Sequence, residues 1–284
     1  MQRFRISCFV MILILPSFAL SFSPKDDLTI ALKERQIQEL SAAGLKLVFY
    51  ISITNSSSKT YYLSAYSYNF VVNQKEYLRL ETNLEQRFRV DSGGETLIAL
   101  PVKITYDLLF QAIPEIQDTD KAACYMMGEL AFADERKERG RLPFGFSGEF
   151  PIFREPEFQL LSFDVSALTI GGADLALLVK IINSNGFELL PDSIRYNIAI
   201  GGHPIGGDHI RGDKSIESHA EKSFSLPLLL NFFEVGKDIY AFLQQDSVPC
   251  QFSGEIEIKT VWGRIAIAFD ESHHIPVKKS SPGL

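Results

Sequence analysis

The 284-residue sequence has three cysteines, one tryptophan and no excess of basic side chains. Its 28 Lys and Arg residues stand against 35 Asp and Glu residues, which gives a formal net charge of −7. Without a cationic surface the chain lacks the electrostatic attraction that phosphate backbones require, so nucleic acid is not an expected partner. Beyond the N-terminal leader no apolar run approaches the roughly 20 residues that span a bilayer, so no membrane span is expected in the mature chain.

Catalytic and metal-binding patterns are also missing. No serine lies in the small-residue elbow of a hydrolase, and no Cys–His or Ser–His–Asp set can be assembled from the spacing. His203 and His209 lie in a Gly-rich stretch beside Asp208, and His273 is followed directly by His274. Adjacent residues on a strand face opposite sides, so His273 and His274 cannot both bind one metal ion. We interpret these histidines as solvated, and predict a protein that is not an enzyme and has no cofactor or metal.

Two further short patterns have simple structural explanations. The Gly pairs at 201–202 and 206–207 have no following helix whose amides could bind a phosphate, so both are predicted as hairpin turns. The tripeptide at 211–213 reads Arg-Gly-Asp, the integrin-type adhesion sequence. Three residues recur by chance, and we interpret this one as an exposed loop.

The first residues are typical of an export signal. Arg3 and Arg5 precede an apolar run at 6–20, and small residues end it at Ser21. We predict a signal peptide at residues 1–21 and a periplasmic or secreted mature chain, with an uncleaved membrane anchor as the alternative. Cys8 precedes the apolar run, which argues against a lipid-modified cysteine at the mature N-terminus.

Hydrophobic alternation predicts β-strands. Residues 45, 47, 49, 51 and 53 are all apolar, and alternate residues of a strand share one face. A similar stretch recurs at 173–183, and the two end in Asn55-Ser56 and Asn183-Ser184. Short polar side chains of this kind hydrogen-bond to nearby backbone and end strands in turns.

The recurrence extends along the chain at a nearly constant offset. Asn55 and Asn183, and Tyr68 and Tyr196, are 128 residues apart, whereas Gly128 and Gly254 are 126 apart. Short strands at regular spacing, with one short helix expected near 106–113 and another near 235–243, favour an all-β fold. We predict two tandem fibronectin-III- or immunoglobulin-like antiparallel β-sandwiches, at residues 24–153 and 156–279.

Cys124 and Cys250 occupy matching places in the two copies. An exported chain with two cysteines could form one disulfide. The bridge requires Cα atoms within about 7 Å, which equivalent residues of tandem domains reach only if those strands meet at the interface. Two buried thiols are the other interpretation, and we favour it.

A family resemblance rests on several of these stretches together. The strand-ending Asn and the downstream Tyr are followed by the segment 100–109, then by Tyr125-x-x-Gly128-x-Leu130 and a closing apolar-Pro pair. In this order, and twice over, they resemble the WHy domain (water stress and hypersensitive response), the fold of group 2 late embryogenesis abundant proteins. Where that family often has Asn-Pro-Asn, this chain has Asn-Ser-Ser at 55–57 and Asn-Ser-Asn at 183–185.

The resemblance implies a sandwich fold with no cofactor, no catalytic residues and a role in tolerance of desiccation, freezing or related stress. The expected function is an exported protein that weakly binds or shields client macromolecules. The alternative is an envelope structural or adhesion module that binds a specific partner through its loops. Asn55, Asn183, Tyr68 and Tyr196 are expected to serve turn hydrogen bonds and buried rings, with a binding role as the alternative.

Overall fold

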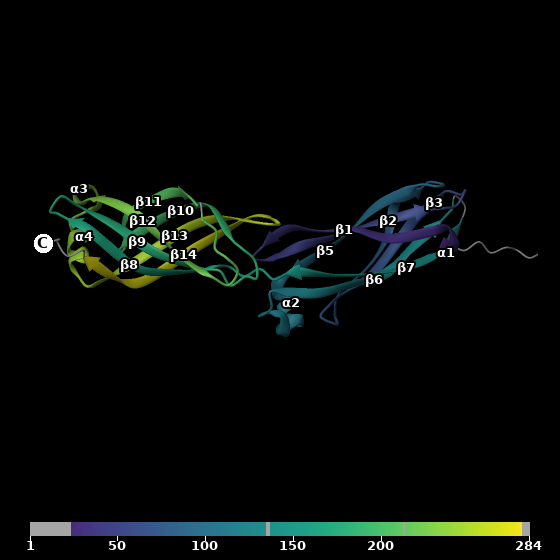
Figure 1. Cartoon of the computed structure of the whole chain (residues 1–284), viewed down its shortest axis with the longest axis horizontal. Coiled ribbons are helices and arrows are strands. Elements are labelled where there is room, and N and C mark those ends of the chain that lie inside the picture. The colour runs from purple at the N-terminus through teal and green to yellow at the C-terminus, as the bar shows by residue number, and fades with distance from the viewer. Residues whose placement is uncertain (1–23, 135–136, 213, 280–284) are drawn as a thin grey trace, which may run out of the picture.

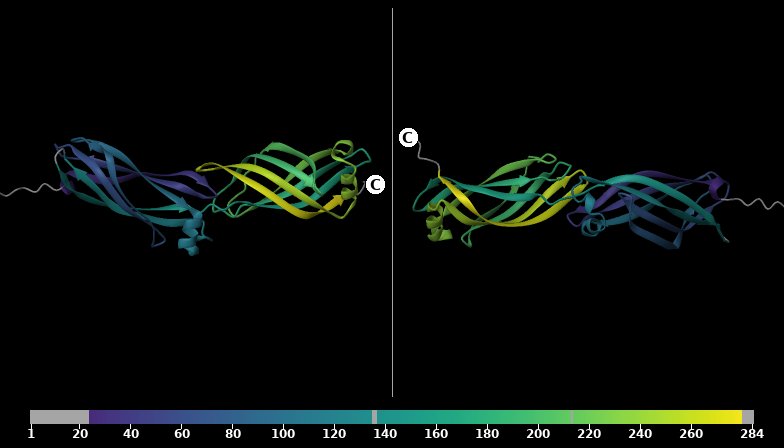
Figure 2. Two further views of the ribbon diagram at one scale, coloured as in Figure 1. Left: turned by 180° about the vertical axis from the view of Figure 1, so that it is seen from behind. Right: turned by 90° about the horizontal axis from the view of Figure 1, so that it is seen from below.

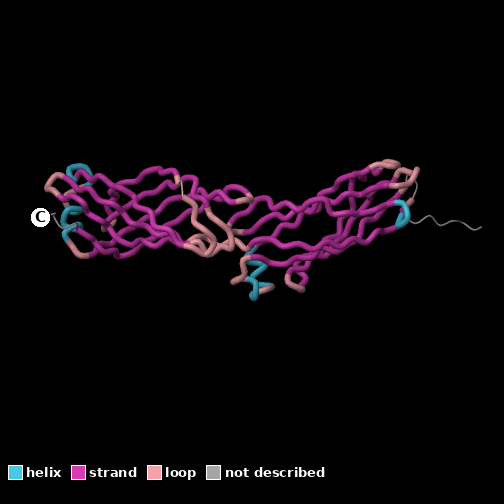
Figure 3. Tube along the Cα trace, in the orientation of Figure 1, coloured by secondary structure: helices cyan, strands magenta, loops and turns pink. Residues whose placement is uncertain are grey.

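The computed structural model describes residues 24–134, 137–212 and 214–279 of the chain. Two elongated β units lie end to end, with the N-terminal and C-terminal ends of the described chain at opposite ends of the molecule (Figure 1). Strands dominate both units, and the helices are short (Figure 3). The predicted all-β class is confirmed. The predicted signal peptide, residues 1–21, lies outside the described residues.

The first unit consists of seven strands and three short helical segments among the described residues. They are α1 Pro24–Asp27, β1 Leu28–Ser41, β2 Gly44–Asn55, β3 Tyr61–Val72, β4 Lys75–Val90, β5 Glu95–Thr105, α2 Tyr106–Ala112, the 3-10 turn η1 Pro114–Ile116, β6 Lys121–Ala133 and β7 Glu138–Pro151.

The second unit repeats this order. Its elements are β8 Glu157–Leu168, β9 Gly172–Ile182, β10 Leu190–Ile200, β11 His203–Arg211, β12 Glu221–Asn231, α3 Phe232–Val235, α4 Asp238–Gln244, β13 Ser247–Thr260 and β14 Gly263–Lys279.

Strand order within the sheets is the same in both units. The first unit has a three-stranded sheet β1-β2-β5 and a four-stranded sheet β4-β3-β6-β7. The second has β8-β9-β12 and β11-β10-β13-β14 in the corresponding places. Inward-facing residues of the two sheets form the core; in β2 and β9, for example, Phe49 and Leu177 are both fully buried. Alternating apolar side chains on facing sheets drive this packing.

One connection differs between the units. In the second unit the end of β14 crosses to the other sheet, where Val277–Lys279 pairs in parallel with Phe163–Val165 of β8. This pairing joins the two sheets into one of seven strands. In the first unit β1 remains an edge strand that pairs with β2. The two units therefore share an architecture but differ at one seam of the sandwich.

Two local expectations need correction. The helix expected at 235–243 is two helices, α3 and α4, because Gly236 adopts a φ of 101° that an α-helix cannot include. The second Gly pair, 206–207, lies inside β11 and not in a turn, whereas Gly201 and Gly202 do form the β10–β11 turn with positive φ.

Two equivalent prolines lie in edge strands. Pro101 lies in β5 and Pro227 in β12, and both strands are at the end of their sheets. Proline has no N–H to donate, so it is tolerated where one side of a strand needs no partner.

Candidate functional site at the junction of the two units

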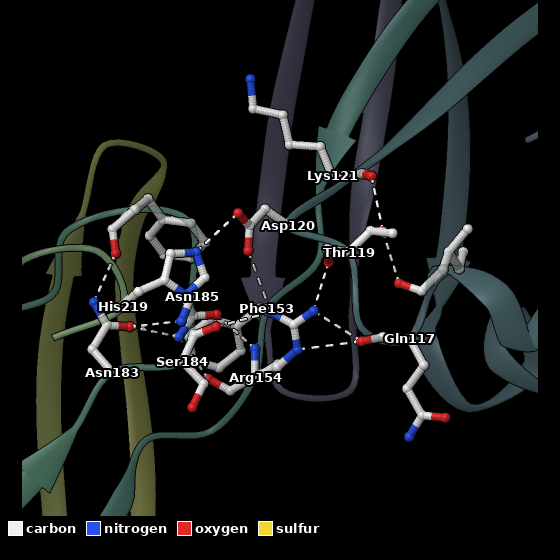
Figure 4. Close-up of polar contacts among 12 residues, drawn as sticks. Gln117, Thr119, Asp120, Lys121, Phe153, Arg154, Asn183, Ser184, Asn185 and His219 are labelled. Carbon is white, nitrogen blue, oxygen red and sulfur yellow. Dashed lines mark hydrogen bonds and ion pairs between the residues drawn. The ribbon is translucent and has the colours of Figure 1, made fainter.

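The two units meet through a short linker and the loops around it. Residues 152–155 leave β7 and enter β8 directly (Figures 1 and 2). Around them lie the segment between η1 and β6, the loop after β9 and the turn between β13 and β14. This is the place where polar side chains from distant parts of the chain converge (Figure 4).

Arg154 in the linker bonds to both units. Its Nη2 donates to the carbonyl oxygens of Gln117 at 2.9 Å and Thr119 at 2.6 Å, both in the first unit. Its Nη1 donates to the carbonyl oxygen of Ser184 in the second unit at 2.9 Å and lies 3.6 Å from Oδ1 of Asp120. A guanidinium offers five N–H donors in a fixed plane, so a single side chain can fasten several carbonyls at once.

Asn185 holds the backbone of the same linker residue. Its Oδ1 accepts from the N–H of Arg154 at 2.7 Å, and its Nδ2 donates to the carbonyl oxygen of Arg154 at 2.9 Å. The same Nδ2 lies 3.0 Å from Oδ1 of Asn183. Asn183 and Asn185 are fully buried. Buried amides of this kind are costly to leave unpaired, so these bonds fix the path of the linker.

Asp120 adds a contact between the units at the surface. Its Oδ2 lies 2.9 Å from Nε2 of His219, in the turn before β12. Gly186 faces the same carboxylate, and a Cβ at that position would meet the Asp120 side chain at 2.5 Å. A larger residue at 186 would push the aspartate away from its partner.

Three aromatic rings pack side by side at the junction. Phe153 of the linker stacks on Phe187 with centroids 6.2 Å apart, and Phe187 meets Trp262 edge to face at 4.8 Å. Trp262 lies in the β13–β14 turn and is half-buried. Aromatic pairs in these geometries contribute about 0.5–1.5 kcal/mol beyond the area they bury, so the rings reinforce the polar contacts of Arg154.

Beside the aromatic rings a groove of about 490 Å³ runs between β1 and the end of β7. Leu32 and Ile37 of β1, Phe150 and Pro151 of β7, and Trp262 provide its apolar walls. The ion pair between Lys121 and Glu149, 2.7 Å apart, lies at its edge. The groove therefore combines an apolar floor with a charged rim.

The asparagines singled out from the sequence have the same environment in both units. Nδ2 of Asn55 donates to the carbonyl oxygens of Lys59, Val90 and Asp91 at 2.7, 3.3 and 3.0 Å. Nδ2 of Asn183 donates to the corresponding carbonyls of Phe187, Ile216 and Glu217 at 2.8, 3.1 and 2.9 Å. Each amide joins the end of a strand to two other loops, which accounts for an Asn at both positions.

The singled-out tyrosines and glycines lie opposite each other. Tyr68 pairs with Gly128 across β3 and β6, and Tyr196 pairs with Gly254 across β10 and β13. A Cβ on Gly128 would collide with the carbonyl oxygen of Ser67, and one on Gly254 with that of Arg195. Tyr68 donates its hydroxyl to the carbonyl oxygen of Pro101 at 2.8 Å.

Burial raises the pKa of both tyrosine hydroxyls. It raises the pKa of Tyr68 to about 12, with a smaller contribution from the neighbouring Tyr66 hydroxyl. It also raises the pKa of Tyr196, with Asp208 adding to the effect. Both rings are protonated at neutral pH, and their place in the core is structural in character.

Cys124 and Cys250 are free and buried, each within the four-stranded layer of its own unit. Burial raises the pKa of both thiols to about 12. The disulfide left open by the sequence is not formed. A thiol with so high a pKa is a poor nucleophile, because the thiolate is the reactive form.

The remaining sequence candidates do not gather into a site. Within the described residues no group of three or more His, Cys, Asp or Glu side chains is placed to hold a metal ion. Asp213 of the Arg-Gly-Asp tripeptide lies outside the described residues. None of the helices in the described part of the chain has the length and apolar content to cross a membrane.

Sequence reasoning missed the residues that form the junction. Arg154, Asp120, Trp262 and His219 are far apart in the chain, and nothing in their local context brings them together. A signal for Asn185 did exist: the 128-residue offset aligns it with Ser57, and the exchange of Ser for Asn marks a position that bonds to the linker in one unit only.

Comparison with known proteins agrees with the fold. Residues 178–273 match the family model LEA_2, described as late embryogenesis abundant protein. The match covers most of the second unit and supports an LEA_2-like family for this part of the chain. LEA_2 is not an enzyme family, and the match runs from β9 into β14.

The search of solved structures returned partial matches that include proteins from an archaeon and a plant. A crystal structure of an Archaeoglobus fulgidus protein is 13% identical with a TM-score of 0.35, covering 44% of this chain and 100% of that one. The solution structure of an Arabidopsis thaliana protein is 15% identical with a TM-score of 0.36, covering 44% of this chain and 83% of that one. No curated protein matches this chain.

Proposed function

We propose that this protein is an exported, non-catalytic stress-protection protein made of two LEA_2-type units, which weakly binds or shields client macromolecules during water loss. The observation that carries the proposal is the family match over 178–273, together with the same strand order in the first unit. The recurring Asn, Tyr and Gly positions support extending the family assignment to the first unit as a second WHy-type copy.

Weak client binding has a physical basis in the exposed apolar side chains. Ile170 is 89% exposed and Phe233 80%. Phe233 belongs to α3, which lies at the end of the second unit distant from the junction (Figure 1), and Gly171, the neighbour of Ile170 in sequence, faces the Phe233 ring. Isolated apolar groups on an otherwise acidic surface give many low-affinity contacts with partly unfolded chains and keep the protein itself dispersed.

Export is part of the proposal because of the leader at residues 1–21. Mass spectrometry of the protein recovered from the periplasm or medium should show a mature N-terminus after Ser21. A chain that stays in the membrane fraction with residues 1–21 intact would instead support the anchored alternative.

Aggregation assays test the protective function. A client enzyme that is dried or heated with a several-fold molar excess of the mature protein should stay in solution in a concentration-dependent way. An equal mass of an unrelated acidic β protein serves as the control. Equal aggregation with both proteins would rule out this function.

A specific envelope or adhesion role is the second candidate, and the fastened junction favours it. A fixed arrangement of two units suits a partner that touches both, since little ordering entropy is lost on binding. Chemical cross-linking in intact cells separates the two functions: one partner in fixed stoichiometry supports the envelope role, and a broad ladder of products supports protection.

A further inference from the structure

The second unit contains a pairing that the first unit lacks, at otherwise equivalent positions. The N–H of Val277 donates to the carbonyl oxygen of Asp246 at 2.9 Å, and the N–H of Ile152 donates to that of Asp120 at the same distance. Up to this bond the ends of β14 and β7 follow the same path. Val277–Lys279 then continues along β8, whereas the first unit turns into the linker at Phe153 and Arg154.

The strand register identifies the edge of the first unit that has no such pairing. Phe163 lies opposite Leu177 in the β8–β9 pair, and Arg35 lies opposite Phe49 in the β1–β2 pair. With the 128-residue offset, Arg35–Ile37 is thus the counterpart of Phe163–Val165, the segment that Val277–Lys279 covers. β1 is the edge strand here, so its outward backbone groups have no strand partner within the described residues.

The side chains along the unpaired edge of β1 are more exposed than their counterparts in β8. Phe163 is fully buried under β14, whereas Arg35 is exposed, and Val165 is 4% exposed whereas Ile37 is only half-buried. The guanidinium of Arg35 reaches across the opening and donates to the carbonyl oxygen of Ser147 on β7 at 3.2 Å. The groove of about 490 Å³ lies at this opening, with Arg35, Ile37, Phe150 and Trp262 among its walls.

We propose that this groove is a docking site for an extended segment of a partner protein, which adds as a parallel strand to β1 at Arg35–Ile37. The second unit supplies the template, since its own tail occupies the equivalent edge. Strand addition gives affinity through main-chain hydrogen bonds and specificity through alternate side-chain pockets. The proposal holds whether or not the chain suppresses aggregation.

The side chains of the groove define the partner. The partner residue opposite Arg35 corresponds to Val277 of the second unit, and the partner residue opposite Ile37 corresponds to Lys279. Arg35 favours a carboxylate at the first place, and Ile37 with Trp262 favours a branched apolar side chain at the second. The expected partner segment is therefore acidic, then any residue, then apolar, in extended form.

Trp262 reports on the groove directly, because it is the sole tryptophan of the chain. The mature protein is titrated with an eight-residue peptide of sequence 272–279 that carries Val277→Glu and Lys279→Val. The matched control peptide carries Val277→Lys and Lys279→Val. Neither peptide contains an aromatic residue other than histidine, so emission above 300 nm comes from the protein.

The acidic peptide should shift Trp262 emission saturably and bind at least several-fold more tightly than the control peptide. Ile37→Lys should weaken binding about tenfold, and amide hydrogen exchange at 34–37 of the unsubstituted protein should slow when the peptide is present. If the Ile37→Lys variant does not fold, hydrogen exchange of the unsubstituted protein still tests whether the peptide binds at β1.

Two outcomes would overturn the proposal. One is the absence of any saturable shift or exchange protection with either peptide. The other is a Trp262 shift with phosphatidylcholine vesicles and none with the peptides, which would assign the groove to lipid instead.

Discussion

Asn185 forms two hydrogen bonds with the backbone of Arg154, accepting from its N–H at 2.7 Å and donating to its carbonyl at 2.9 Å. In the first unit the equivalent position is Ser57, whose hydroxyl donates to Oδ1 of Asn55 at 2.9 Å. The inner role, bracing the strand-ending Asn, is therefore common to both units. The outer role, holding the linker, belongs to the second unit alone.

Asn185→Ala should loosen the junction and lower the free energy of unfolding by about 1–3 kcal/mol, because it leaves partly buried backbone groups of Arg154 without these partners. Urea unfolding measures the loss, and a red shift of Trp262 emission in the native protein reports the loosening. Ser57→Ala is the matched control, which should leave Trp262 emission unchanged. A red shift of equal size in both variants would contradict the special role of Asn185.

Gly128→Ala should destabilise the first unit by about 1–3 kcal/mol or more, because the new methyl group collides with the carbonyl oxygen of Ser67. Gly145→Ala is the control: its methyl group meets the hydroxyl of Tyr125, a 40% exposed side chain that can move aside. Thermal unfolding of the two variants should differ clearly. Equal melting temperatures would mean that the sheet relaxes around Gly128 at little cost.

The thiols of Cys124 and Cys250 should be inert in the native protein. Burial raises the pKa of both to about 12, so almost no thiolate exists at pH 8. A thiol-reactive dye should label the mature chain, which lacks Cys8, only after urea is added, and then at two sites per molecule. Failure to label in urea without a reductant would instead reveal the disulfide that the structure lacks.

Stability should fall in alkaline solution. The pKa of Tyr68 is raised from 10.0 to about 12, so the unfolded chain loses this proton first and the stabilisation is lost as pH rises from about 10 to 12. The expected loss is roughly 1–3 kcal/mol for this group. The two thiols add to it from about pH 9 upward.

Tyr68→Phe isolates the contribution of one ring. It removes the hydroxyl that donates to Pro101, which should cost about 0.5–1.5 kcal/mol at neutral pH, and it should flatten the pH dependence between 10 and 12. Unfolding in urea at pH 8, 10 and 11.5 gives both quantities. An unchanged slope in the variant would show that Tyr68 does not ionise in this range.

Local pattern was sufficient to predict much of the fold. Alternation predicts β2 and β9, and the constant offset places Asn55 and Asn183 at equivalent turns. These features depend on neighbours in sequence or on a repeat of the same pattern, and both are visible in the chain.

The junction could not be predicted in this way. Arg154 bonds to carbonyls at 117, 119 and 184, and backbone carbonyls carry no sequence signal. The Gly pair at 206–207 was misassigned because glycine in a strand marks close backbone approach as readily as a turn, and Gly207 lies against the carbonyl oxygen of Tyr196. The pairing of the end of β14 with β8 has no local signal either, because the partner strand lies more than a hundred residues earlier.

The contacts of Arg154 also set an order of assembly. All strands of the first sandwich are complete once residue 151 has been synthesised, and the carbonyls of Gln117 and Thr119 are then already in place. Ser184 and Asn185 emerge later, and His219 later still. The first unit of a growing chain can therefore complete its core before the second unit is available. The hydrogen bonds that fasten the junction form only after the second unit has folded.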